Sequence, residues 1–373
     1  MKRLLFTLLF AGVIISCNTK SKTYKGYLVI KANTNSADIK FGNRLFKGIW
    51  KIDPNAPIDT INVPCIQPKD PFLFRTDIDS ISFLVEGGKS YDFYVQLKDS
   101  GYAHTIIRGK AMHKENLNFK EEISNSDINI KYPKTETSSH LKNLAEKYPI
   151  TNLIENKKSD IDKILNVLNW TNSRWEHNGN VSPSKSDAIT ILDEAQEGKN
   201  FPCFAYAIVL KSQLENAGFK ARTIYLKTKD VETRQNSPGH VATEVYSNEL
   251  AKWIFVDGQF NLMPTKNNIP LNAVELQQAI NNGYETLTMK SLAEVSKRDY
   301  IEFVYDYLYY FDVSLDQRYS EDTAKKTHKI SNKSNLMLTP KGSKNPTKID
   351  FWKITLDDYL YTNSLAEFYA KPI

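Results

Sequence analysis

Residues 201–219 read FPCFAYAIVLKSQLENAGF, a stretch that predicts one helix with a cysteine at its start. Apolar residues recur at roughly helical spacing over 204–217. Asn200 suits the N-cap, and Pro202 suits the first turn, where its missing N–H costs nothing. We therefore expect Cys203 in the first turn, where free N–H groups and the positive end of the helix dipole lower a thiol pKa.

Two later segments supply an imidazole and a carboxylate. SPGHVATEVY at 237–246 and KWIFVDGQ at 252–259 are typical of two strands, with a turn-like stretch between them. An antiparallel hairpin centred on residues 248–249 would place position i opposite position 497 − i, so that His240 faces Asp257. Directly opposed residues have Cβ atoms about 4.5–5.5 Å apart, close enough for a carboxylate–imidazole hydrogen bond.

Cys203, His240 and Asp257 are the three side-chain types of a cysteine acyl-transfer site. In such a site the thiolate attacks, the imidazole carries the proton and the carboxylate orients the imidazole. Each also has a structural explanation when taken alone, as a buried small hydrophobe, a strand residue and a turn residue. Their order and local structure together favour a catalytic triad. Gly239 and Gly258 beside them would allow other backbone to approach closely.

These residues carry a family resemblance over about residues 160–264. A helix with an N-terminal cysteine, then Gly-Phe-Lys-Ala-Arg-Thr, a strand opening with histidine and Trp-Ile-Phe-Val-Asp resemble the transglutaminase-like superfamily. The resemblance implies an α+β fold with a papain-like core and a triad of Cys203, His240 and Asp257. Members often have Gly-x-Cys at the nucleophile, whereas this chain has Phe-Pro-Cys at 201–203, and the proline removes one backbone donor near the expected oxyanion hole.

The resemblance also implies an aromatic residue near the nucleophile, supplied by the segment that precedes it. That segment should begin with a helix, because apolar residues fall on one helical face at Ile161, Ile164, Leu165, Leu168 and Trp175. Trp170, Trp175 and His177 are the candidates for lining the acyl pocket. Core packing is the alternative for each of them, and a hydrogen-bond donor in the cleft is a second role for His177.

Residues 1–16 have the pattern of a secretory signal peptide. A basic pair at positions 2–3 precedes an apolar stretch at 4–15 that is too short to span a bilayer. The stretch ends in Ile-Ile-Ser-Cys, which resembles a bacterial lipobox and implies lipidation of Cys17. Residues 17–24 would then form a polar tether. A plain signal peptide that happens to contain a cysteine is the alternative.

Composition narrows the classes of partner. The formal net charge of +6 becomes +4 once Lys2 and Arg3 leave with the signal peptide. Nucleic-acid binding needs a concentrated basic stripe and is not expected. The histidines lack ligand spacing, so we expect no metal and no cofactor. The expected partners are a peptide, protein or amide substrate and, through the lipid, a membrane. Asn18 in place of an inner-membrane retention aspartate favours the outer membrane of the cell envelope.

Four regions follow the tether. Short β-branched or aromatic runs predict a small β-sandwich at 25–112, including a hairpin that turns at residues 87–88. Residues 113–150 are polar and predict a connector, 151–264 the transglutaminase-like core, and 265–373 a C-terminal α/β extension packed on the core.

Several elements of the extension are also predicted. Helical patterns occur at 271–282 and at 296–311, where an aromatic face is best explained by docking onto the core. Leu-Met-Leu at 336–338 predicts a short strand. Because Cys65 and Cys203 fall in different predicted domains, we expect two thiols rather than a disulfide.

Three functions are compatible with these patterns. The first is an envelope enzyme that hydrolyses peptide or amide bonds, and it is favoured because nothing in the sequence marks an acyl-acceptor lysine site. The others are a cross-linking transglutaminase and a catalytically retired domain that serves as a binding or scaffold module. The proline before Cys203 keeps the retired domain in consideration. A histidine within reach of both Cys203 and Asp257 at an open cleft would favour an enzyme.

Overall fold

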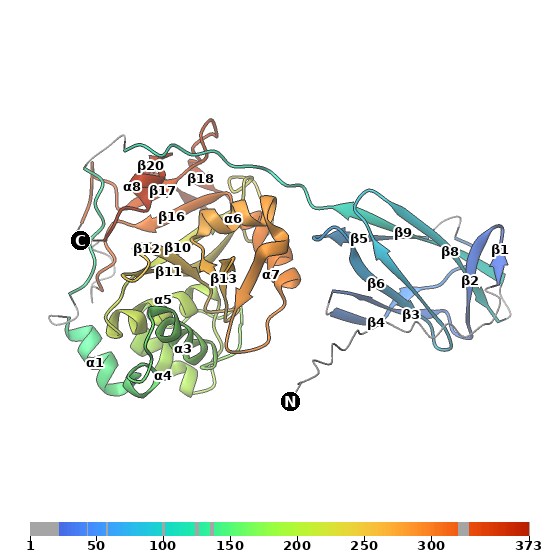
Figure 1. Cartoon of the computed structure of the whole chain (residues 1–373), viewed down its shortest axis with the longest axis horizontal. Helices are drawn as coiled ribbons and strands as arrows, with labels where there is room; N and C mark the ends of the chain where they lie inside the picture. Colours follow the sequence, from blue (N-terminus) through green and yellow to red (C-terminus); the bar gives the residue numbers. More distant parts are fainter. Residues whose placement is uncertain are drawn as a thin grey trace, which may run out of the picture. The chain divides into compact units, whose positions relative to one another are not determined.

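The computed structural model describes residues 22–42, 44–56, 59–98, 101–123, 127–134, 138–319 and 328–372. The chain divides into two compact units, residues 1–112 and 113–373 (Figure 1). The expected signal peptide and its Cys17 lie outside the described residues. Within the described ranges, no helix combines the length and apolarity that crossing a bilayer requires.

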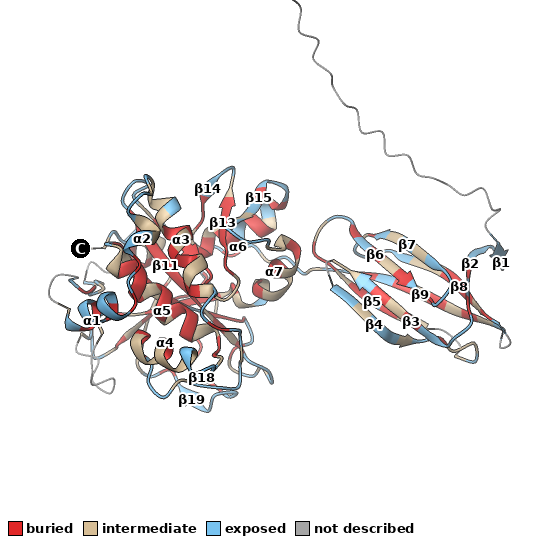
Figure 2. Ribbon diagram, turned by 90° about the horizontal axis from the view of Figure 1, so that it is seen from below, coloured by how far each residue is buried: buried red, intermediate tan, exposed pale blue. Residues whose placement is uncertain are grey.

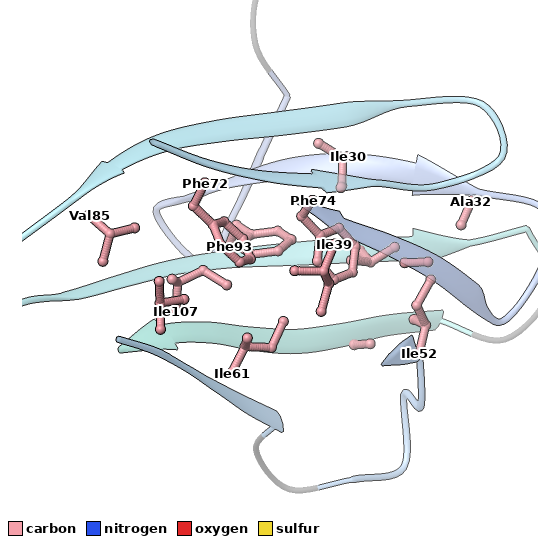
Figure 3. Packing of buried hydrophobic residues seen from close by; sticks show 14 of the residues in the cluster. Ile30, Ala32, Ile39, Ile52, Ile61, Phe72, Phe74, Val85, Phe93 and Ile107 are labelled. Carbon is pink, nitrogen blue, oxygen red and sulfur yellow. The ribbon is translucent and has the colours of Figure 1, made fainter. Parts of the chain in front are cut away.

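Two sheets form the N-terminal unit, with strand orders β1-β2-β8-β9-β5 and β4-β3-β6-β7. The strands are β1 (Thr23–Tyr24), β2 (Tyr27–Ala32), β3 (Ser36–Phe41), β4 (Arg44–Lys51), β5 (Asp59–Cys65), β6 (Asp70–Arg75), β7 (Ser80–Val85), β8 (Ser90–Leu97) and β9 (Gly101–Ala111). Apolar side chains from both sheets share one core, which includes Ile30, Phe72, Phe74, Phe93 and Ile107 (Figure 3). This is the packing of a β-sandwich.

The predicted hairpin at Gly87 and Gly88 is wrong. β7 pairs with β6, whereas β8 pairs with β9 in the other sheet, so the turn carries the chain between sheets. A Cβ on Gly87 would lie 2.7 Å from the Cβ of Ala111, and Gly88 has a φ of +83°. The two glycines therefore let the chain pass close to Ala111 as it crosses from one sheet to the other, and they do not form a two-residue hairpin.

Cys65 is buried in this sandwich core. Its Sγ lies 3.6 Å from the carbonyl oxygen of Val63 and 3.7 Å from that of Val85. Cys203 belongs to the other unit, and both cysteines are free thiols among the residues that the structure describes.

A six-stranded sheet of order β12-β11-β10-β16-β17-β20 organises the second unit (Figure 1). Its strands are β10 (Lys220–Lys227), β11 (Gly239–Ser247), β12 (Lys252–Val256), β16 (Tyr310–Ser314), β17 (Asn335–Leu338) and β20 (Tyr359–Thr362). Two smaller sheets contain β13 (Met263–Lys266), β14 (Ile269–Pro270), β15 (Leu287–Lys290), β18 (Lys348–Ile349) and β19 (Ile354–Thr355). Three of the six central strands thus come from residues beyond 264, and the expected α+β fold class is confirmed.

Helices cover both faces of this sheet. They are α1 (Ser139–Lys147), α2 (Thr151–Ile154), α3 (Asp160–Asn172), α4 (Ala188–Gln196), α5 (Cys203–Asn216), α6 (Ala273–Asn282), α7 (Lys297–Val304) and α8 (Leu365–Phe368). On one face, Ile164 of α3 and Leu210 and Leu214 of α5 pack with Val245 and Ile254 of the sheet. Figure 2 shows the red, buried interior along α5 and β11. α4 is an additional helix that was not predicted, and it begins after an Asp187 side-chain cap.

A buried ion pair joins the opposite face to the C-terminal residues. Arg222 of β10 and Glu244 of β11 are both fully buried, with 2.7 Å between Nη2 and Oε2. Arg222 Nη1 donates to the carbonyl oxygen of Phe368 at 2.8 Å. Glu244 Oε1 accepts from the N–H of Ala273 at the start of α6 and from the Tyr369 hydroxyl. These hydrogen bonds hold α6 and α8 against the sheet. Removing either partner of the pair would leave the other charge buried and unpaired.

We predict that Arg222→Leu lowers the free energy of unfolding by about 3–5 kcal/mol, because it leaves Glu244 buried without its cation. The matched control is Lys147→Ala, which breaks an ion pair with Asp193 whose side chains are 52% and 37% exposed. That control should change stability by only about 0–1 kcal/mol. Urea unfolding of the full chain measures both values, and equal small losses would contradict the prediction.

Candidate active site

Cys203 is the first residue of α5. Pro202 is the N-cap, in extended conformation, and no side chain caps this helix end. The prediction that Asn200 caps the helix is wrong, because its Oδ1 accepts from the Glu176 N–H at 3.0 Å instead. Since the proline lies outside the first turn, its missing N–H removes none of the first-turn donors. Those N–H groups remain directed at whatever anion forms near the thiol.

His240 and Asp257 lie together, although not in the predicted register. His240 Nε2 is 2.8 Å from Asp257 Oδ2. The hairpin pairs Thr243 with Val256, so position i faces 499 − i rather than 497 − i. The turn spans residues 248–251 and is longer than expected, with Ala251 at a φ of +49°. Asp257 therefore follows the end of β12, and its side chain reaches His240 from there.

The Asp257 carboxylate is fully buried and accepts four hydrogen bonds. Its Oδ2 accepts from His240 Nε2 and, at 3.0 Å, from the Tyr300 hydroxyl. Its Oδ1 accepts from the N–H groups of Gln259 at 3.1 Å and Phe260 at 3.2 Å. Four donors offset the loss of hydration that burial imposes on a carboxylate. Because the carboxylate only accepts, Nε2 carries the proton, and Nδ1 is left for the thiol.

The turn after Asp257 is held by the two helices beneath it. Asn172, the last residue of α3, donates from Nδ2 to the carbonyl oxygens of Gly258 at 3.1 Å and Gln259 at 3.0 Å. A Cβ on Gly258 would lie 3.1 Å from the Cβ of Tyr206 in α5. As expected, a glycine here allows a close approach, so α5 carries Cys203 and also braces the turn that carries the carboxylate.

The electrostatics of the site favour a thiolate–imidazolium pair. Burial by itself lowers the pKa of His240, but the charge and hydrogen bond of Asp257, together with Cys203, raise it to about 10. Burial raises the pKa of the Cys203 thiol, yet interactions with His240 and with the Val241 N–H outweigh it and hold that pKa below its ordinary value. Both shifts favour the thiolate–imidazolium pair over the neutral pair, and the thiolate is the reactive form of a nucleophilic cysteine.

Aromatic residues from α7, from the 3₁₀ turn after it and from the turn after Asp257 enclose the histidine. Ring centroids lie 5.0 Å from the His240 ring for Phe303 and 6.2 Å for Phe260 and Tyr307. The predicted docking of this aromatic face is confirmed, since Tyr300 and Phe303 contact the His240–Asp257 pair. The predicted length of the helix is wrong, because α7 ends at Val304 and residues 310–311 belong to β16. Sequence reasoning missed the contribution of Tyr300 to this site, because helical spacing marks an aromatic face without showing which residues it meets.

The three predicted pocket residues have different surroundings. Trp175 is 7% exposed and packs in the core against Phe201 and Tyr206. Trp170 is partly buried, and the Arg174 guanidinium lies over its ring at 4.7 Å. His177 forms a bridge with Phe201, two residues before the nucleophile. Partial burial and the charge of His240 lower the pKa of His177, which places it within electrostatic reach of the pair.

Within the described ranges, no group of three or more His, Cys, Asp or Glu side chains is arranged to hold a metal ion. The groups that the site brings together are the thiol, the imidazole, the carboxylate and the first-turn N–H groups of α5.

We predict that His240→Ala raises the pKa of the Cys203 thiol, because the burial of the thiolate is then no longer offset by the imidazolium. The rate of alkylation by iodoacetamide, followed against pH with mass spectrometry of the Cys203 peptide, reports this pKa. In the wild type the midpoint should lie below the ordinary value of about 8.5, and in the variant above it.

His113→Ala is the control, since His113 is an exposed residue of the same unit. It should leave the alkylation midpoint of Cys203 unchanged. A wild-type midpoint equal to that of a free cysteine would contradict the favoured thiolate.

Comparisons with known proteins identify the family of this region. The family described as the transglutaminase-like superfamily matches residues 149–258. No curated protein matches the chain. A solved structure from Cytophaga hutchinsonii, provisionally named a cysteine protease, is 14% identical, with a TM-score of 0.27, over 48% of this chain and 56% of that chain. A structure described as a TGase is 16% identical, with a TM-score of 0.25, over 36% of this chain and 35% of that chain.

The chain thus spans about half the length of the first of these structures and about a third of the second. The family match extends from residue 149, just before α2, to the residue after Asp257, and so contains all three side chains of the site. Residues 149–258 of this chain belong to the transglutaminase-like superfamily.

Proposed function

We propose that this chain is an envelope-anchored cysteine acyl-transfer enzyme that hydrolyses peptide or amide bonds through Cys203, His240 and Asp257. The observation that carries the proposal is the buried His240–Asp257 pair beside a partly exposed Cys203 at a helix N-terminus. A cysteine that only packs in a core would not need a neighbouring imidazole, or a carboxylate that accepts four hydrogen bonds and orients that imidazole.

The proposed reaction has two halves. The Cys203 thiolate attacks the carbonyl carbon, and the oxygen takes up the electron pair of the C=O bond while first-turn N–H groups of α5 donate to it. The His240 imidazolium then gives its proton to the departing amine as the C–N bond breaks, leaving a thioester. In the second half His240 takes a proton from water, hydroxide adds to the thioester carbonyl, and the thiolate leaves as the acid forms.

Each supporting residue has a definite part in this reaction. Asp257 keeps the proton on Nε2 and stabilises the imidazolium, so that Nδ1 stays directed to the thiol. Tyr300 acts through Asp257 and is a positioning residue. Phe303 and Phe260 keep water away from the buried imidazole, which strengthens its interaction with the carboxylate.

Water is proposed as the acyl acceptor, because no feature of the sequence marks a site for an acceptor lysine. Lys227, which lies next to Gly239 in the sheet, is buried in an ion pair with Asp312 and is not presented as an acceptor. An amine acceptor would make the same thioester a cross-linking intermediate, so the acceptor is the point that an experiment must decide.

The anchor is proposed from the lipobox-like sequence that ends at Cys17. Metabolic labelling with a fatty acid should mark the wild-type chain, and Cys17→Ala should abolish the label. Fractionation should place the lipidated chain in the outer membrane. A labelled Cys17→Ala chain would contradict this anchor without touching the acyl-transfer chemistry.

We predict that a peptide-library digest, read by mass spectrometry, yields cleavage products with the wild type and none above background with Cys203→Ala. Asp257→Asn should reduce turnover by about 10²–10⁴-fold, since the histidine loses its orientation. Circular dichroism of each variant checks that its fold is retained.

A parallel assay with a fluorescent primary amine identifies the acceptor. Amine incorporation without free-acid product would indicate cross-linking in place of hydrolysis. An unmodified library, with no amine incorporation, would instead indicate a retired domain that binds without turnover.

A further inference from the structure

A short hairpin in the C-terminal region exposes large apolar side chains. It consists of β18, a turn at residues 350–353 and β19 (labelled in Figure 2). Three of its residues are Phe351, Trp352 and Ile354, with 45%, 42% and 44% of their surfaces exposed. A cluster of such side chains on one small hairpin is costly in water and commonly marks a contact surface.

The hairpin is firmly held at its base. Ile349 is fully buried and packs with Val231. The Glu232 carboxylate accepts from the Thr347 N–H at 2.8 Å, the Thr347 hydroxyl at 3.0 Å and Lys344 Nζ at 3.0 Å. These interactions, the Thr347 N–H foremost, lower the pKa of Glu232 to about 2. The aromatic tip is therefore presented from a fixed base.

Trp352 rests against the residue that precedes His240. A Cβ on Gly239 would lie 2.8 Å from Cη2 of the Trp352 indole and 3.6 Å from Cζ2. Gly239 is not among the glycines with positive φ, so backbone conformation does not explain its presence. The close packing of the indole does explain it, because any other side chain would push the ring away. Trp352 thus lies beside the backbone of the residue that precedes His240.

The surroundings of the His240 ring are also aromatic. Phe260, Phe303 and Tyr307 lie around the imidazole and are each only partly buried. Trp352 adds an exposed ring beside the backbone of the same histidine. Alternate residues of a strand share a face, so Gly239 lies on the same face of β11 as Thr243, whose hydroxyl donates to the Ala207 carbonyl oxygen of α5. Trp352 therefore packs on the face of the strand that meets α5, the helix that begins with Cys203.

We propose that Trp352 and Phe351 form a subsite that binds an aromatic or large aliphatic side chain of the substrate, next to the scissile carbonyl. The inference rests on the proposed function and deepens it by naming a substrate class. Trp352 is then the residue that determines specificity, and Gly239 is the position that lets its ring come close enough. Burial of a large side chain against exposed rings supplies the preference.

The test measures binding in the full chain carrying Cys203→Ala, so that no turnover interferes. Two capped tripeptides, Gly-Phe-Gly and Gly-Ala-Gly, are titrated, and ligand-detected NMR gives their dissociation constants. The phenylalanine peptide should bind about ten-fold more tightly. Adding Trp352→Ala should reduce the ratio to about one, with little change for the alanine peptide. Gly239→Ala should also reduce the ratio, because it displaces the indole.

Ile269→Ala is the matched control, since Ile269 is a 57% exposed apolar residue on β14, in a different sheet. It should leave the ratio of the two dissociation constants unchanged. Equal affinities for the two peptides before Trp352 is changed, or a ten-fold ratio that survives Trp352→Ala, would overturn the subsite.

Failure of the subsite and failure of the proposed function give different results. Iodoacetamide alkylation of Cys203, measured in the wild type and in Trp352→Ala, reports the thiolate independently of the peptide side chain. An unreactive Cys203 alongside a tryptophan-dependent preference would contradict the enzyme and retain the subsite. A reactive Cys203 without that preference would contradict the subsite and leave the proposed enzyme standing.

Discussion

The buried carboxylate of Asp257 is the constraint on which the site depends. A charge with no exposure to water must be matched by hydrogen-bond donors, and here the donors come from three separate parts of the chain. His240 comes from β11, Tyr300 from α7, and two N–H groups from the turn after β12. Satisfying one carboxylate therefore fixes the ring orientation of the histidine and the place of a helix more than forty residues downstream.

The same dependence extends to the residues beyond 264. They supply three strands of the central sheet and the aromatic residues of α7 that enclose His240. They also supply the partners of the buried Arg222–Glu244 pair and the hairpin that brings Trp352 against Gly239. The region matched to the transglutaminase-like superfamily ends at residue 258, so this chain completes its proposed site with segments that lie outside that match.

Much of the local structure could be predicted from the sequence, and the errors were specific. The helix beginning at Cys203 and the two strands carrying His240 and Asp257 follow from periodicity. The register was wrong by two residues because the turn is longer than assumed, with Ala251 in the left-handed region. The hairpin at residues 87–88 was wrong because a glycine turn has the same sequence pattern whether it joins two strands of one sheet or strands of two different sheets. Asn200 was placed at the N-cap, yet it caps nothing on α5 and holds residue 176 instead.

By itself the sequence determined the order and type of the elements around Cys203, His240 and Asp257, because spacing, caps and turn residues act over a few neighbouring positions. It also singled out the three side chains on which the proposed acyl transfer rests. Only the tertiary structure decided that Tyr300 completes the carboxylate's hydrogen bonds, that Trp170 and Trp175 pack into the protein, and that Trp352 meets Gly239. Those contacts join residues dozens to more than a hundred positions apart, and their partners are set by the packing of the whole unit, which no local pattern encodes.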